Sequence, residues 1–168
     1  MDYIIAIDPG PVFSAYVVWD GNEVVSKGIL ENPKLLKFLI ERWDSCQMVI
    51  EEVRSYGMPV GITVFDTVWW SGRFCQAWGE QFFRVPRLQV KQYLCHDSRA
   101  KDSNIRQALI DRFGKPGTKK APNLKYGEDG SKEGKLVKDM WAALALAVTF
   151  WDKNKERYNH DKTQDIRL

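Results

Sequence analysis

The chain has 168 residues, of which 44% are hydrophobic and 28% charged. This length fits a single domain, at about 100–200 residues per domain, and the composition excludes a wholly disordered protein because it can form a packed core. No apolar run approaches the roughly 18 residues that span a bilayer, and the first residues lack the features of a signal peptide. We therefore expect a cytoplasmic protein with no membrane partner.

Charge is distributed unevenly along the chain, whose net charge is +3. Residues 1–83 carry 6 Lys and Arg against 11 Asp and Glu, whereas residues 84–168 carry 19 against 11. This pattern indicates either a carboxylate centre beside a polyanion-binding surface or simply a solvated charged surface. The three cysteines form no CxxC pair and the two histidines are isolated. Any metal should therefore be a hard cation held by carboxylates.

Strands and helices alternate along the predicted chain. The predicted strands cover 3–7, 13–19, 24–30, 47–53 and 82–85. The predicted helices begin at Asn32 or Pro33 and cover 62–78, 103–113 and about 135–153. This order predicts an α/β protein with a mixed five-stranded sheet, a three-strand antiparallel opening and helices on both faces. It is typical of the ribonuclease H-like fold.

We expect one domain over residues 1–155 and a polar C-terminal tail over 156–168. Within the domain, residues 115–134 are rich in Gly, Pro and Lys and have almost no apolar side chains. This composition predicts a flexible basic loop. Its lysines, which include Lys119 and Lys120, are candidate contacts to phosphate groups.

Three acidic residues from distant segments are expected to converge. Asp8 ends the first strand in an Asp-Pro-Gly turn, Glu51 ends the fourth strand, and Asp139 lies near the start of the last helix. Close carboxylates repel one another, and divalent cations relieve that repulsion. Two Mg²⁺ ions about 3.5–4 Å apart, for which Mn²⁺ can substitute, would activate a water and stabilise the leaving oxygen of a phosphodiester.

Each acid also has a simpler interpretation when it is taken alone. Asp8 fits a turn, Glu51 a solvated strand end, and Asp139 the favourable position of an acid at a helix N-terminus. Glu52 remains an alternative to Glu51, because a one-residue change of register exchanges which of them faces the site.

Several segments resemble the RuvC Holliday-junction resolvases. These segments are IIAIDPG, VIEEV, QVKQ, AKDSNIRQAL and KDMWAALALAV, and together they span roughly residues 3–150. YGMPVGITVFDTVWWSGRF and AKDSNIRQALIDRFG look closer still to phage-encoded RuvC-like proteins. The resemblance implies a Mg²⁺-dependent homodimer that cleaves branched DNA such as a four-way junction, in the bacterial host cytoplasm if the protein is phage-encoded.

The resemblance also implies roles for single residues. Asp8, Glu51 and Asp139 would bind the metal, while Lys91 and Lys101 would contact the scissile region or backbone phosphates, with Lys101 among the catalytic residues. The alternative for both lysines is a solvated surface position.

The chain departs from the family pattern at two positions. Many members place a second acid three residues along the last helix, where this chain has Ala142. Either Asp139 serves alone, or the alignment slips by one turn, or activity is impaired. Some members place a base-stacking aromatic residue three residues after the strand Glu, where this chain has Arg54, with Tyr56 two residues later. Both are candidate DNA contacts, and Tyr56 either wedges against unpaired bases or packs in its loop.

The sequence therefore predicts a metal-dependent endonuclease that resolves Holliday junctions or other branched DNA by paired nicks. The alternative is a non-catalytic module of the same fold that binds branched DNA. An actin-like or sugar-kinase ATPase is disfavoured because the chain has no second Gly-rich phosphate loop and no duplicated domain, so we expect no nucleotide cofactor. Trp69, Trp70 and Phe74 are predicted to be core or dimer-interface residues.

Overall fold

The computed structural model describes residues 3–41, 46–55, 57, 59–79, 81–114, 136 and 139–164, with side chains as far as Lys155. The strands are β1 (Tyr3–Asp8), β2 (Phe13–Trp19), β3 (Val24–Glu31), β4 (Cys46–Glu52) and β5 (Phe82–Pro86). The helices are α1 (Asn32–Ile40), α2 (Ile62–Trp78), α3 (Arg87–Cys95), α4 (Asp102–Phe113) and α5 (Met140–Gln164).

The five strands form one mixed sheet in the order β3-β2-β1-β4-β5. β1, β2 and β3 pair antiparallel as a meander, whereas β4 pairs parallel with both β1 and β5. Parallel pairing requires a crossover connection, and α1 and α2 provide the crossovers into β4 and β5. The predicted mixed sheet with an antiparallel opening is confirmed.

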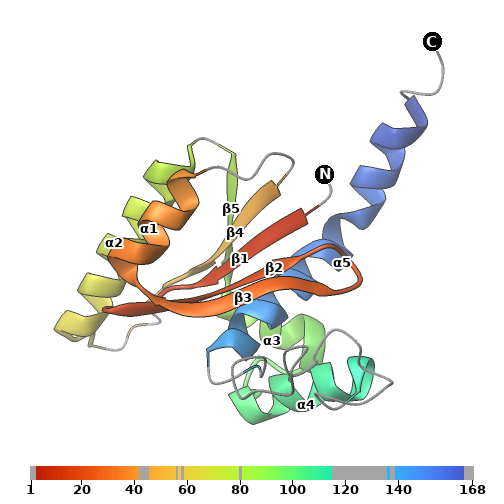
Figure 1. Ribbon diagram of the computed structural model, residues 1–168. Coiled ribbons are helices and arrows are strands. Elements are labelled where there is room, and N and C mark those ends of the chain that lie inside the picture. The colour runs from red at the N-terminus through yellow and green to blue at the C-terminus, as the bar shows by residue number, and fades with distance from the viewer. Residues whose placement is uncertain are drawn as a thin grey trace, which may run out of the picture.

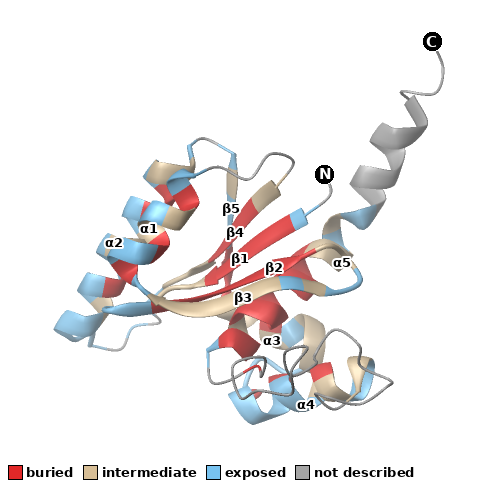
Figure 2. Cartoon of the chain, viewed as in Figure 1, coloured by how far each residue is buried: buried red, intermediate tan, exposed pale blue. Residues whose placement is uncertain are grey.

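Helices cover both faces of the sheet (Figure 1). Alternate residues of a strand point to opposite faces, and β1 shows this clearly. Ile4 and Ala6 join the core formed with α5, α3 and α4, while Ile5 and Ile7 join the core formed with α1 and α2. Figure 2 shows that burial is concentrated in the central strands and in the part of α5 that lies against them.

The first half of α5 is apolar on every side. The six residues from Ala143 to Val148 are all buried, because this part of the helix packs against β1 and β2 and also against α3 and α4. A helix that is apolar all round is stable only where it is enclosed in this way. The small alanines let α5 lie close to the sheet, which brings its N-terminal end near the ends of β1 and β4.

Two elements differ from the sequence prediction. α3 was not predicted, because it follows β5 with no intervening loop and buries only Val90, so its hydrophobic periodicity is weak. α5 begins at Met140 and continues to Gln164, past the predicted end at 153. The first part of the predicted polar tail is therefore helical, and the predicted basic loop over 115–134 lies outside the described residues.

Among the helices of the described residues, none has the length and apolarity that crossing a membrane requires.

Candidate active site

Asp8 and Glu51 lie next to each other where β1 and β4 end. The parallel register sets Ile7 opposite Ile50, so the following residues, Asp8 and Glu51, are also neighbours. Two residues earlier, Ala6 and Val49 both belong to the core on the α5 face. Because side chains alternate along a strand, Asp8 and Glu51 share that face.

Glu52 points to the other face of the sheet. Its carboxylate pairs with Arg54 at 2.7 Å and lies 4.0 Å from Arg84. The register therefore brings Glu51 and not Glu52 to Asp8. Arg54, a predicted DNA contact, is an exposed residue in the loop after β4, where it forms this ion pair with Glu52.

The turn that carries Asp8 is fixed by two buried polar side chains. The Gly10 amide donates to Ser14 Oγ (3.1 Å), the Ser14 hydroxyl donates to Asn32 Oδ1 (2.7 Å), and Asn32 Nδ2 donates to the Gly10 carbonyl (2.9 Å). A Cβ atom at Gly10 would lie 2.2 Å from the Phe13 carbonyl oxygen, which excludes any larger residue. The exit of β1 is thus held tightly in one conformation.

Arg87 is a site residue that the sequence analysis missed. It is the first residue of α3, and its guanidinium binds Glu51 Oε2 through Nη1 at 2.7 Å and Asp102 Oδ1 through Nη2 at 2.6 Å. Asp102, the first residue of α4, was missed as well. Arg87 could have been found only if α3 had been predicted, because that helix starts directly after β5 and places Arg87 at the end of the sheet.

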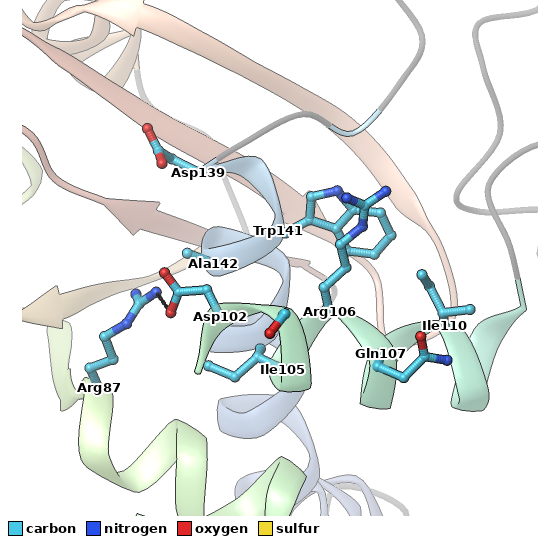
Figure 3. Close-up of a pocket in the computed structure, with 10 residues that line it drawn as sticks. Arg87, Asp102, Ile105, Arg106, Gln107, Ile110, Asp139, Trp141 and Ala142 are labelled. Atoms are coloured by element: carbon cyan, nitrogen blue, oxygen red, sulfur yellow. Dashed lines mark hydrogen bonds and ion pairs between the residues drawn. The ribbon is translucent and has the colours of Figure 1, made fainter. Parts of the chain in front are cut away.

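Asp139 approaches from the start of α5. It is exposed, and its carbonyl accepts a hydrogen bond from the Ala143 amide (3.0 Å) in the first turn of the helix. Asp139, Ala142, Arg87 and Asp102 all line a cavity of about 580 Å³. Figure 3 shows Asp139 and Ala142 at the start of α5 and the side chain of Arg87 pointing toward Asp102. This cavity is open to solvent, and its lining includes Asp139 and Asp102 but neither Asp8 nor Glu51.

Burial dominates the electrostatics of the site, and like charges add to its effect. Burial and the nearby charges of Glu51, Asp139 and Asp102 together raise the pKa of Asp8 to about 8, against the lowering effect of Arg87. Burial also raises the pKa of Glu51, against the lowering effects of Arg87 and Lys91. Strongly raised carboxyl pKa values of this kind are typical of functional sites. Asp8 therefore lies within electrostatic reach of Glu51, Asp139 and Asp102, and the site is short of positive charge.

The chemistry of this donor set fits a hard divalent cation, because Mg²⁺ prefers carboxylate oxygens. The shortage of positive charge at the site also fits a divalent cation, which would offset the charge of the carboxylates. Within the described ranges, however, no three His, Cys, Asp or Glu side chains are close enough together to hold a metal ion. Asp8, Glu51 and Asp139 are the residues that would hold it, after movement of their side chains.

The two predicted lysines differ in their relation to the acids. Lys91 lies on α3, half-buried, and its charge acts on Glu51. Lys101 is exposed, directly before α4, and lines a second cavity of about 370 Å³ beside Asn104 and Asp111. Tyr56, Lys119 and Lys120 lie outside the described residues.

The aromatic residues of α2 separate into two groups. Phe74 is buried in the core with α1, and Trp70 packs against that core. Trp69 instead has 63% of its surface exposed. The prediction of core or interface residues is confirmed for Phe74, while the role of Trp69 stays a prediction.

Comparison with solved structures identifies the fold. The chain is similar to the Thermus thermophilus RuvC structure, with a TM-score of 0.61 and 18% identity over 90% of this chain and 95% of that one. It is also similar to T. thermophilus RuvC in complex with Holliday junction substrate, with a TM-score of 0.63 and 16% identity over 89% of this chain and 92% of that one. No family model matches the sequence, and no curated protein does. The chain has the RuvC-like, ribonuclease H-like fold, and the resemblance to phage-encoded members stays a prediction.

Proposed function

We propose that this protein is a divalent-metal-dependent endonuclease that cuts branched DNA, in particular four-way junctions. The observation that carries this proposal is the meeting of Asp8 and Glu51 on one face of paired strands, with Asp139 added from the residue before α5. The fold also supports the proposal, because a protein of the same fold was solved in complex with a Holliday junction substrate.

Each acidic residue has a distinct contribution in this proposal. Asp8 and Glu51, on adjacent strands, form the rigid side of the metal site, and Asp139 completes it from the solvent side. The chemistry that Mg²⁺ or Mn²⁺ supplies when bound is polarisation of a phosphodiester and activation of water at neutral pH. The Ser14 and Asn32 contacts fix the backbone of the turn that follows Asp8, so only the Asp8 side chain has to move to take up a metal.

Basic residues around the acids would bind the DNA backbone. Lys91 on α3 places a positive charge beside Glu51, which suits it to the scissile phosphate. Lys101 stands one residue before Asp102 and would contact a neighbouring phosphate. We propose further backbone contacts from Arg54, Lys119 and Lys120, and stacking of Tyr56 on an unpaired base.

We propose that the protein acts as a homodimer through α2. Ile62, Phe65 and Trp69 are spaced so that they share one face of α2, and they are 76%, 63% and 63% exposed. An exposed apolar stripe of this kind marks an interaction surface. Two-fold symmetry would present two sites to the two strands of a symmetric junction.

The first test is cleavage of a synthetic four-way DNA junction with and without Mg²⁺. We expect symmetric paired nicks that require the metal, are lost in Asp8→Asn and Glu51→Gln, and persist in Glu52→Gln. Glu52→Gln is the matched control, because it removes the adjacent carboxylate from the opposite face.

One feature favours a second candidate function, a non-catalytic module that binds branched DNA. Ala142 lines the cavity one turn after Asp139, so Asp139 is the single acid that the start of α5 and the residue before it bring to this lining. Tight junction binding with no nicks in either Mg²⁺ or Mn²⁺ would contradict the nuclease and support this module.

A further inference from the structure

We propose that Arg87 is the resident cation of the acidic site: its guanidinium neutralises Glu51 and Asp102 in the metal-free protein, and a divalent cation must compete with it to bind. This inference rests on the proposed metal site and assigns a residue that controls how strongly that site takes up metal. Arg87 would then be a positioning residue and not a metal ligand.

The contacts of Arg87 join three separate elements. Glu51 comes from the end of β4, Arg87 from the start of α3 and Asp102 from the start of α4. The two terminal nitrogens of the guanidinium bind one carboxylate each, at 2.7 and 2.6 Å. A planar guanidinium can bridge two carboxylates in this forked way, whereas a lysine ammonium acts as a single point of charge.

The sheet register explains why Arg87 reaches this place. Val85 of β5 lies opposite Glu51 of β4, and both face the α5 side. Arg87 follows Val85 by two residues, and Pro86 between them ends the strand. The side chain of Arg87 is therefore delivered to the same face as Glu51, just past the end of the sheet.

Burial makes this pairing a substantial one. The side chains of Arg87 and Glu51 are only 28% and 15% exposed, whereas Asp102 is 76% exposed. A carboxylate as buried as Glu51 is costly to leave without a partner. Arg87 supplies that partner, and its charge also reaches Asp8.

A divalent cation and Arg87 would act on the same carboxylate. Glu51 is one of the three proposed metal ligands, and its Oε2 atom is bound to Arg87. A metal at Glu51 would displace the guanidinium or be repelled by it at short range. Asp102 offers an exposed carboxylate to which Arg87 can remain attached when Glu51 turns to the metal.

Arg106 provides a matched control within the same cavity. It also lines the cavity, but its guanidinium lies over the ring of Trp141, 5.0 Å from the ring centre. Arg106→Gln therefore makes the same change of charge as Arg87→Gln without removing the bridge between Glu51 and Asp102.

The test measures Mn²⁺ affinity by calorimetry and thermal unfolding with and without Mn²⁺, on the full chain. Without metal, we expect Arg87→Gln to lower Tm by roughly 4–8 °C, more than Arg106→Gln does. We expect Arg87→Gln to bind Mn²⁺ about tenfold more tightly than the wild type, because the competing charge is gone. Equal or weaker Mn²⁺ binding by Arg87→Gln would overturn the inference.

A second measurement covers the case in which Arg87→Gln does not fold without metal. The side-chain NMR signals of Arg87 in the wild type should shift as Mg²⁺ is added, while those of Arg106 stay in place. The Arg87→Lys variant keeps the positive charge but lacks the guanidinium. The side-chain signals that are missing from its spectrum are therefore those of Arg87. Signals of Arg87 that do not respond while Mg²⁺ binds would overturn the inference.

These results separate the inference from the proposed function. If competition between Mn²⁺ and Arg87 is observed but no junction is cut, the proposed function fails and the inference stands. If junctions are cut and Arg87→Gln binds Mn²⁺ like the wild type, the inference alone fails.

Discussion

At the scale of single residues, the turn after β1 depends on a polar network in the core. Asn32 and Ser14 are buried, at 0% and 1% exposure, and they bond to each other and to both polar groups of the Gly10 backbone. Buried polar groups are tolerated only when their hydrogen bonds are satisfied. The hydrogen bonds of Ser14, Asn32 and Gly10 thus satisfy one another, and together they fix the turn that carries Asp8.

We predict that Asn32→Ala destabilises the protein by about 1–3 kcal/mol, because it leaves the Ser14 hydroxyl and the Gly10 carbonyl without these partners. Urea unfolding measures this loss. The double variant with Ser14→Ala should lose clearly less than the sum of the two single losses, since both changes break one network. Strict additivity of the two single effects would contradict the network.

The register between β1 and β4 determines which acidic residue of β4 lies beside Asp8. Asp8 and Glu51 are adjacent on paired strands and face α5, while Glu52 faces the arginines on the opposite side. One residue of slip would exchange Glu51 and Glu52. Met48, Val49 and Ile50 are all fully buried. A slip of one residue would therefore move Gln47 or Glu51 into a buried position, which is unfavourable for a polar side chain.

At the scale of elements, the helices on the α5 face are tied together by one ionic cluster. Asp152 of α5 accepts hydrogen bonds from Tyr93 of α3 (2.9 Å) and from Arg112 of α4 through both terminal nitrogens. The side chain of Asp152 is 6% exposed. This cluster holds α3 and α4, which carry Arg87 and Asp102, against α5, which follows Asp139.

The Asp152 cluster predicts a pH dependence of stability. Burial by itself would raise the pKa of Asp152, but the hydrogen bonds from Arg112 and Tyr93 and the charge of Arg112 bring it below the ordinary value. Its contribution to stability is therefore complete above the ordinary value of 3.8 and is lost as the pH falls toward the lower folded value.

We accordingly predict that Asp152→Asn lowers stability at pH 7 by about 1–3 kcal/mol and flattens the loss of stability in acid. Thermal unfolding between pH 7 and pH 3 measures both effects. Asp111→Asn is the control, because it removes an exposed carboxylate of α4 that accepts a hydrogen bond from Gln107 of the same helix. An unchanged acid slope in Asp152→Asn would argue against the cluster.

At the scale of the whole molecule, α2 leaves an apolar face toward solvent. Ile62, Phe65 and Trp69 form this face, and Arg73 lies over the Trp69 and Trp70 rings at 5.3 and 4.3 Å. The opposite side of α2 packs against α1 and the core through Phe74. The outer face is available to a second copy of the chain without any change in the core.

We predict that the wild type is a dimer in solution and that Phe65→Asp or Trp69→Asp makes it monomeric, because a buried unpaired charge is strongly unfavourable at an interface. Sedimentation equilibrium measures the mass, and far-ultraviolet circular dichroism checks that the fold is kept. Val25→Asp, on exposed residue Val25 of β3, is the matched control and should remain dimeric. A monomeric wild type at tens of micromolar would contradict the prediction.

The sequence by itself determined most of the elements, though not α3, and the acidic residues that stand at their ends. Periods of 2 and 3.6 residues are local properties, so the strands over 13–19 and 82–85 and the helix over 62–78 could be predicted closely. The acids at positions 8, 51 and 139 stood out because each ends or begins such an element.

Only the tertiary structure decided which polar side chains meet. The choice of Glu51 over Glu52 needed the register of β4, the Asn32–Ser14 network needed the packing of α1 beside β2, and the Arg87 bridge needed α3 and α4 in place. The physical reason is that hydrophobic periodicity is written into neighbouring residues, whereas an ion pair between residues 36 positions apart exists only after the chain has folded.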